Sequence, residues 1–310
     1  MLVVPMRGMA VKSLRIMLYV SLFSLLVSLI GLTVDHRLIG GELAWIKPFK
    51  FSLSFSVYAL TLMAFTAVLN DSSCFRRSCT FACWGAVVDL AAIITQVWRG
   101  TASHFNEATG FDTLLYVLVR AAIVPVAAAM VVSFVILWRR PLPPVIGCAM
   151  LWGALVTVVG FIPGMIMLLP DHLQAVLTTH TFDGHCVGLP AGGPGLPFLG
   201  WSTVAGDLRV AHFVGIHAAQ AVPVFGLMLN RFSRLTVLRQ EMLVSVFSSA
   251  YFAIVVLLTR QALRGHSVVS FDSFTLTCAV AVALTMVVGT LMILPWRSAL
   301  DIEVQTQTSA

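Results

Sequence analysis

Eight apolar stretches, each 19–26 residues long, are the feature that most limits how this chain folds. They lie near residues 14–33, 51–69, 79–98, 113–138, 145–169, 210–230, 241–259 and 274–295. A helix needs about 20 mostly apolar residues to cross a bilayer. Only 10% of the residues are charged, against about 25% in soluble domains. The sequence therefore predicts an all-α, polytopic membrane helix bundle of eight transmembrane helices within a lipid bilayer.

The positions of Lys and Arg predict the orientation of these helices. The connections 70–78, 139–144 and 231–240 are short, and each contains two or three arginines. With both termini cytoplasmic, eleven Lys and Arg lie on the inner side, including Arg7 and Arg297, and seven lie on the outer side. Positive charge favours the cytoplasmic side. The same rule accounts for the net charge of +6, so we expect no nucleic-acid partner.

The histidines are distributed on one side only. With this orientation all eight fall in outer loops or in the outer part of the 210–230 helix, and eight of the thirteen acidic residues lie on the same side. The functional face is therefore predicted to point outward.

Matching motifs predict an internal duplication. An Arg-Gly pair, a histidine and a Phe-Asp pair occur in this order at residues 99–112 and again at 264–272. Residues 1–144 and 145–296 are then two tandem four-helix halves with the same orientation, which is the pattern of parallel repeats. The second half contains a long outer loop, 170–209, and residues 297–310 form a cytoplasmic tail. We expect a site between the halves.

His212, His217 and Gln220 occur at the start of the 210–230 helix. Polar side chains at membrane depth are costly and often functional. Residues five apart project roughly 140° apart on a helix, so the two histidines cannot bind one metal ion as an i, i+4 pair does. They are candidate cofactor ligands or proton relays with different partners. Hydrogen bonding between packed helices is the alternative.

His104 and His266 occupy equivalent positions in the two halves. A neutral imidazole binds haem iron or another transition metal, or relays protons near neutral pH. The alternative is that these loops only make turns, with Asp112 and Asp272 as helix N-caps. A Phe-Asp pair just before an apolar run fits an N-cap, so we expect both aspartates to be caps.

Several charged residues on the predicted outer side are candidates for binding acidic groups of a ligand. The planar guanidinium of arginine suits carboxylates and phosphates. For residues 45–50, anchoring at headgroup depth is the alternative. The ligand-binding candidates are Lys47, Arg99, Arg209 and Arg264, with Asp207 beside Arg209 and Gln220 in the following helix.

Asp89 and Arg120 lie at similar depths in neighbouring predicted helices. An ion pair between them would relieve the cost of two charges inside the membrane. We expect a structural pair, with proton or ion coupling as the alternative.

The loop 170–209 contains adjacent His185 and Cys186. The sequence shows neither the ligand spacing of a zinc site nor an obvious fourth ligand. An ordered cap over the bundle and a solvated loop both remain open.

Three motifs resemble those of a group of bacterial multi-spanning membrane proteins: W-I-K-P-F-K-F, R-G-x-x-S-H-F-N and W-S-T-x-x-G-D-L-R-V-A-H-F-x-G-x-H-A-x-Q. The resemblance spans about residues 40–272 and implies a bacterial inner membrane, but no particular activity. The layout is similar to haem A synthase, with eight helices, a four-plus-four duplication and histidines toward the outer face. That likeness implies haem-ligand histidines at positions such as His212, whose pseudo-equivalent is Lys47.

Three functions are consistent with these residues. The leading hypothesis is a haem- or quinone-linked membrane redox protein with its cofactor between the halves. The second is a transporter or receptor for a small anionic solute or lipid. The third is a metal-dependent enzyme that acts on lipid headgroups through His104, His266 and Asp112.

Overall fold

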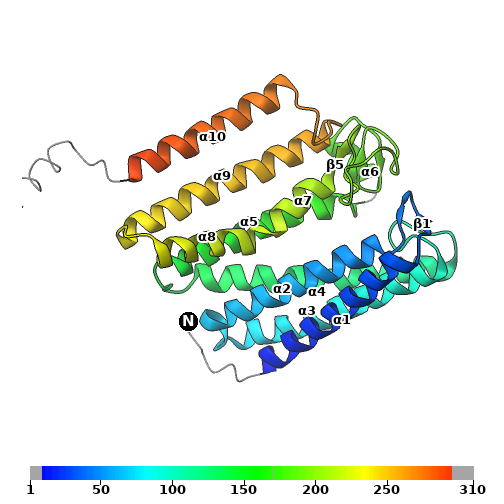
Figure 1. The fold of residues 1–310 in the computed structure, drawn as a ribbon, viewed down its shortest axis with the longest axis horizontal. Coiled ribbons are helices and arrows are strands. Elements are labelled where there is room, and N and C mark those ends of the chain that lie inside the picture. Colours follow the sequence, from blue (N-terminus) through cyan, green and yellow to red (C-terminus); the bar gives the residue numbers. More distant parts are fainter. Residues whose placement is uncertain (1–8, 170, 295–310) are drawn as a thin grey trace, which may run out of the picture.

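The computed structural model describes residues 9–169 and 171–294 as a bundle of long helices (Figure 1). Among the described residues, seven helices are long and apolar enough to cross a membrane. A bent pair, α7 (Leu208–Ile216) and α8 (Ala218–Phe232), makes an eighth crossing if the two form one span. The prediction of an all-α, multi-pass membrane protein is confirmed at this level. Arg7, Arg297 and the tail 297–310 lie outside the described residues.

The first four helices pack on one another. They are α1 (Met9–Val34), α2 (Ile46–Leu69), α3 (Ser73–Arg99) and α4 (Gly110–Trp138). Helix α1 packs against α2 and α3, and α3 packs against α4. Ser72 begins α3 by accepting a hydrogen bond from the backbone N–H of Phe75, and Gly100 ends it at a φ of 74°, a conformation that glycine adopts without strain.

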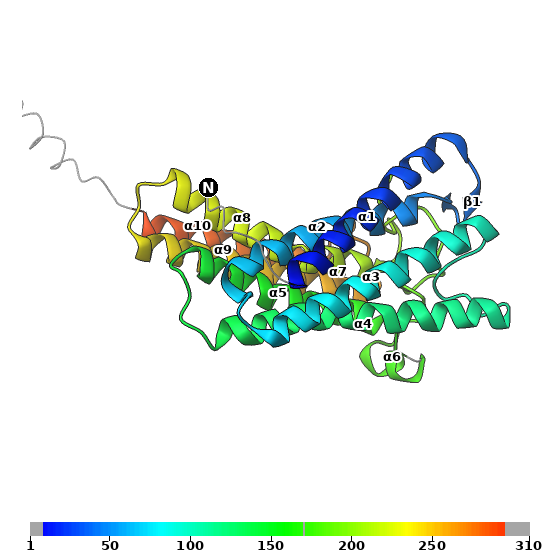
Figure 2. The ribbon, with the colours of Figure 1, turned by 90° about the horizontal axis from the view of Figure 1, so that it is seen from below.

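The remaining helices repeat this order of contacts. Helix α5 (Ile146–Ile166) packs against α7, α8 and α9 (Val237–Leu263), and α10 (Ser273–Ile293) packs against α9. Helices α4 and α5 connect the two groups. Helix α10 lies at the edge of the bundle (Figure 1), where it buries only Thr275 and Ile293 among its residues. The short helix α6 (Asp171–Leu177) lies apart from the bundle (Figure 2).

The two ends of the bundle differ. One, the arginine end, contains the connections 70–72, 139–145 and 233–236. The other, the strand-bearing end, contains an antiparallel hairpin and a three-stranded antiparallel sheet. The hairpin is β1 (Leu38–Ile39) and β2 (Glu42–Leu43); the sheet is β3 (Phe182–Asp183), β4 (Cys186–Val187) and β5 (Gly206–Asp207). The first turn of α1 and the last turn of α10 both lie at the arginine end (Figure 1).

The predicted 210–230 helix is broken rather than continuous. Helices α7 and α8 meet at His217 with a bend of 40°. Thr157 of α5 inserts at this point: its hydroxyl donates to the carbonyl of Ile216 and accepts from the backbone N–H of Ala219. An inserted side chain and a proline are recognised causes of helix kinks, and Pro223 follows in α8.

Two expectations about helix starts were wrong. Helix α2 begins at Ile46, so Lys47 lies in its first turn and not in a loop; proline is tolerated in a first helical turn, and Pro48 lies there. Helix α4 is capped by Thr109, which places Asp112 at the third helical position. The expectation for Asp272 is confirmed, since it caps α10 by accepting from the N–H of Thr275 at 2.8 Å.

Helices α5 and α7 touch through glycines. A Cβ atom added to Gly160 would lie 2.4 Å from the carbonyl carbon of Gly215, and one added to Gly215 would lie 2.4 Å from the Cα of Gly160. These distances are well inside van der Waals contact, so the two backbones meet with no side chain between them. Small residues allow this close approach in membrane bundles.

We expect Gly160→Ala to destabilise the protein. In an isolated helix the change would be favourable by about 1 kcal/mol, but the overpacking cost is about 1–3 kcal/mol, and the neighbour here is backbone that cannot rotate away. The midpoint of thermal unfolding in detergent should therefore fall. Gly289→Ala in α10 is the matched control, because its Cβ would approach only the side chain of Val246, at 3.3 Å. Equal midpoints for both variants would contradict the proposed contact.

Candidate functional site

Arg209 joins the two groups of helices at the strand-bearing end. Its guanidinium donates to the carboxylate of Asp207 at 2.7 Å, and its Nη1 lies 3.5 Å from Oε1 of Glu42, in β2 between the first two helices of the first group. Lys50 completes the network, since its Nζ lies 3.3 Å from Glu42 and 2.9 Å from the carbonyl of Leu199. The predicted ligand-binding Arg209 is thus occupied by carboxylates of the protein itself.

Asp207 has two structural roles. It caps α7 by accepting from the N–H of Arg209, and it accepts from the N–H of Ser202 in the preceding loop. Burial raises the pKa of Asp207, but the hydrogen bonds and charge of Arg209 lower it more, so the pKa lies below its ordinary value. Asp207 therefore stays charged, and it holds the loop onto the helix.

We expect Arg209→Gln to destabilise the fold strongly. The side chain of Asp207 is 0% exposed, so the substitution leaves a buried carboxylate without its counter-charge, at a cost of about 3–5 kcal/mol. Arg140→Gln is the control, because Arg140 pairs with Asp71, whose side chain is 69% exposed, and exposed pairs contribute about 1 kcal/mol or less. Chemical unfolding in detergent should separate the two variants clearly. A smaller loss for Arg209→Gln than for Arg140→Gln would contradict this assignment.

Asp89 and Arg120 do not form the expected ion pair. Arg120 donates instead to the carbonyl of Leu168 at 2.9 Å and lies over the ring of Tyr116. Asp89 is 0% exposed, and neither of its carboxylate oxygens has a hydrogen-bond partner among the described residues. The charge that acts on Asp89 is that of Lys47 in α2. Asp89 and Arg120 lie at similar positions along their helices, but their side chains do not project toward each other.

His104 lies partly buried between aromatic rings in the loop before α4. Its ring lies 5.6 Å from that of Phe51 and 6.4 Å from that of Phe105, and its Nδ1 lies 3.1 Å from the hydroxyl of Ser103. Burial, with the charge of Lys47 as a smaller cause, lowers the pKa of His104 well below 6.5. The imidazole is therefore neutral near pH 7.

Because His104 stays neutral in the folded protein, the stability of the fold should decrease as the pH is lowered. In the unfolded chain this histidine takes up a proton near its ordinary pKa of 6.5, whereas the folded protein does not. Below pH 6.5 the free energy of unfolding should therefore decrease, by up to about 1.4 kcal/mol per pH unit.

His104→Gln should flatten this dependence when unfolding is measured between pH 7 and 5 with a chelator present. His185 keeps part of the slope, because burial lowers its pKa to about 4. His36→Gln is the control, since His36 is exposed. The same slope in wild type and His104→Gln would exclude a neutral His104 in the folded protein.

His212 and His217 have different partners. His212 packs against the small residues of α5: its Nδ1 lies 2.8 Å from the carbonyl of Gly160, and a Cβ on Gly164 would meet its ring at 2.7 Å. His217 lies at the break in the span, with Nδ1 3.0 Å from Oε1 of Gln220. Its buried Nε2 has no hydrogen-bond partner among the described residues.

Gln220 carries a polar connection between the groups within the bundle. Its amide Nε2 donates to the hydroxyl of Thr61 in α2 at 2.7 Å. His217, Gln220 and Thr61 therefore form a polar chain that runs from the broken span into the first group of helices, inside a largely apolar bundle.

The two Arg-Gly motifs fold alike. Helices α3 and α9 both end in Gln-x-x-Arg-Gly, and Gly100 and Gly265 both have a φ of 74°. Arg99 pairs with Asp112, and Arg264 pairs with Asp272. Hydrogen bonds from Thr275 and Arg264 lower the pKa of Asp272 to about 2, so it remains charged. Both arginines predicted to hold a ligand are thus paired within the protein.

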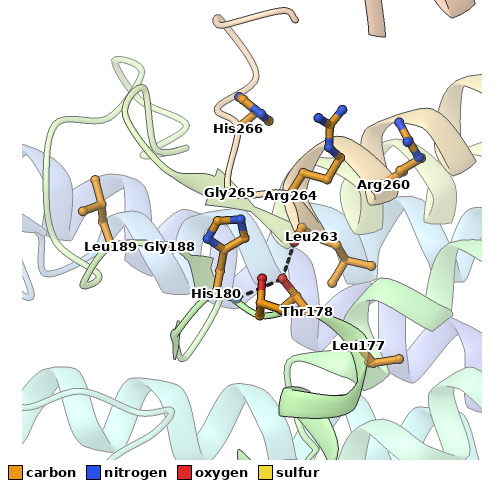
Figure 3. Close-up of a pocket in the computed structure, with 11 residues that line it drawn as sticks. Leu177, Thr178, His180, Gly188, Leu189, Arg260, Leu263, Arg264, Gly265 and His266 are labelled. Atoms are coloured by element: carbon orange, nitrogen blue, oxygen red, sulfur yellow. Dashed lines mark hydrogen bonds between the residues drawn. The ribbon is translucent and has the colours of Figure 1, made fainter. Parts of the chain in front are cut away.

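A cavity of about 740 Å³ opens beside Arg264 (Figure 3). We call it the His/Arg pocket, defined by His180, Arg260, Arg264 and His266, which line it from α9 and from the loops on either side. Thr178 also lines it: its hydroxyl donates to the carbonyl of Leu263 at 2.7 Å and accepts from the backbone N–H of His180 at 3.2 Å (Figure 3). The sequence indicated Arg264 and His266 but not His180 or Arg260.

Arg260 is the cation of the pocket that remains available. It lies one helical turn before Arg264, with its guanidinium carbon 3.8 Å from the centre of the Phe274 ring. Among the described residues no carboxylate forms an ion pair with it. A guanidinium stacked on an aromatic ring keeps its N–H donors free for an acidic ligand.

The metal-ligand set of the third hypothesis is not assembled. His104 lies among aromatic rings, Asp112 is bound by Arg99, and His266 lies in the His/Arg pocket. In the part of the chain that the structure describes, the group close enough to hold a metal ion is His185, Cys186 and Asp207. The sequence alone showed the first two but not the third.

Comparison with known proteins found no matching family model, no matching curated protein and no matching solved structure.

Proposed function

We propose that this chain is a receptor or transporter for an anionic molecule, either a small solute or the headgroup of a lipid. The observation that carries the proposal is the His/Arg pocket, in which Arg260 has no carboxylate partner among the described residues. Its lining combines two arginines and two histidines with leucines and glycines. Ligand sites commonly combine an apolar lining with a few polar groups in this way.

The proposed topology has eight spans in two tandem halves, with both termini cytoplasmic and the strand-bearing end outward, in a bacterial inner membrane. Three observations support it. Helices α1–α4 and α5–α10 share an order of contacts, α3 and α9 end in the same turn, and both described chain ends lie at the arginine end. The pair α7–α8 then counts as the sixth span.

The broken span supports transport rather than simple reception. Discontinuous helices with polar groups at the break are typical of transporter sites. The break at His217 lies nine residues, or about 14 Å at 1.5 Å per residue, from the start of α7 at the strand-bearing end. Its polar chain reaches Thr61 in the other half. Movement of one half against the other would have to break and re-form the hydrogen bonds of this polar chain. The buried Asp89 offers a protonatable group for proton coupling.

Replacing Arg260 should weaken anion binding. We would titrate purified protein in a neutral detergent with inorganic phosphate and, separately, with a short-chain phosphatidylglycerol, using calorimetry. A hydrogen bond to a charged group is worth about 1.5–3 kcal/mol, so Arg260→Gln should lower the affinity about tenfold to a hundredfold. Binding of phosphate identifies a free anion as ligand, and binding of the phospholipid alone identifies a headgroup.

Arg231→Gln is the matched control. Arg231 also lies over an aromatic ring, that of Phe232 at 5.6 Å, but at the arginine end of the bundle. The Arg231→Gln protein should bind both probes as the wild type does. The proposal fails if neither probe binds wild type, or if the Arg260 and Arg231 variants have the same affinity.

A haem- or quinone-linked redox function is the second candidate. The observation that favours it is the buried Nε2 of His217, which has no partner among the described residues and is the kind of group that coordinates haem iron or hydrogen-bonds a quinone oxygen. An absorption spectrum of gently purified protein, before and after dithionite, distinguishes the candidates. A Soret band that is lost in His217→Ala would favour the redox function.

A further inference from the structure

His185, Cys186 and Asp207 come together where two short strands pair. Their ligand atoms, an imidazole nitrogen, a thiol sulfur and a carboxylate oxygen, all lie within 4.8 Å of one another. Cys186 in β4 is directly opposite Asp207 in β5, and His185 immediately precedes Cys186. A backbone hydrogen bond also joins the two segments here: the N–H of Leu208 donates to the carbonyl of His185 at 3.1 Å. Strand pairing thus unites Asp207 with Cys186, which lies 21 positions earlier in the sequence.

The thiol of Cys186 and the imidazole of His185 are free to bind a metal ion, and the cluster is largely shielded from solvent. Cys186 is a free thiol, 3% exposed, and no hydrogen bond from another described residue reaches its sulfur or the ring of His185. The side chain of Asp207 is 0% exposed. A partly buried imidazole and a buried thiol face a buried carboxylate. Buried polar atoms usually have partners. A metal ion would supply one for the thiol and the imidazole, and Asp207 would ligate it while keeping its hydrogen bonds from Ser202 and Arg209.

Neighbouring residues hold the carboxylate of Asp207 in a fixed orientation, as is usual for carboxylates that bind metal ions. Asp207 accepts from the N–H of Ser202 at 3.0 Å and from Arg209. Ligating carboxylates are commonly held by such outer hydrogen bonds. Arg209 adds a positive charge near the site, but Glu42 lies 3.5 Å from its Nη1 and offsets that charge.

We infer that His185, Cys186 and Asp207 form a binding site for a divalent transition metal, with zinc as the best fit. Zinc binds nitrogen, sulfur and carboxylate oxygen, and Mg²⁺ and Ca²⁺ prefer oxygen alone. Three protein ligands leave a fourth position of the tetrahedron for water or for an exchangeable ligand. Binding replaces the thiol proton of Cys186, which passes to solvent.

A metal ion here would stiffen the wall of the His/Arg pocket. Gly188 and Leu189, which line that pocket, follow Cys186 by two and three residues. The ion would fasten this segment to β5 and hence to the start of α7. The metal site is nevertheless independent of which ligand the pocket takes, and its presence can be tested without knowing that ligand.

Cobalt titration of the full chain tests the site. Protein purified in detergent is stripped with a chelator, and Co²⁺ is added while the absorption of the cobalt–thiolate bond is followed. We expect one equivalent per chain, displaced by one equivalent of Zn²⁺. Cys186→Ser should abolish the thiolate absorption, and His185→Ala should weaken Zn²⁺ binding at least tenfold in calorimetry.

Cys74→Ser is the matched control, because Cys74 is an exposed free thiol at the opposite end of the bundle. It should leave the titration unchanged. Circular dichroism shows whether each variant is folded, and the wild-type result stands even if Cys186→Ser is not. The absence of a thiolate band in wild type would overturn the inference. So would retention of the band in a folded Cys186→Ser protein, since the thiolate would then belong to another cysteine.

Discussion

The ion pairs of Arg209 hold the strand-bearing end of this protein together. One guanidinium bonds Asp207 at the start of α7 and reaches Glu42 before α2, so a single side chain links the loops of both groups of helices. The buried carboxylate of Asp207 requires this partner, because a charge without a counter-charge is costly away from water. The cap of α7 and the loop at Ser202 are positioned by this link.

Hydropathy was sufficient to locate the membrane helices, because a spanning helix must be apolar over most of its length. It did not reveal the break at His217. That break depends on Thr157, a residue of α5, whose hydroxyl replaces a backbone partner of α7 and α8. The expected Asp89–Arg120 pair failed for a related reason. Counting residues from a membrane surface gives the depth of a side chain, but its direction around the helix axis is determined by packing.

The candidate site could be predicted only in part. The Arg-Gly repeat led to Arg264 and His266, which line the pocket, and to Arg99, which does not. Arg260 was missed because a lone arginine at a helix end looks like an interfacial anchor. Its availability depends on Asp272 binding its neighbour Arg264 instead. Asp207 was recognised beside Arg209, but its approach to Cys186 follows from strand pairing across a 20-residue loop, which has no local signature.

The glycine contact between α5 and α7 also determines how the halves of the broken span can move. Gly160 and Gly215 meet backbone to backbone, which gives α7 a fulcrum close to its end at Ile216. His212 lies at the same contact, with its Nδ1 2.8 Å from the carbonyl of Gly160. His212 and His217 lie on opposite sides of Gly215 along the chain. A tilt of α7 would therefore change the contact of His212 with α5, whereas His217 lies at the break beyond the end of α7.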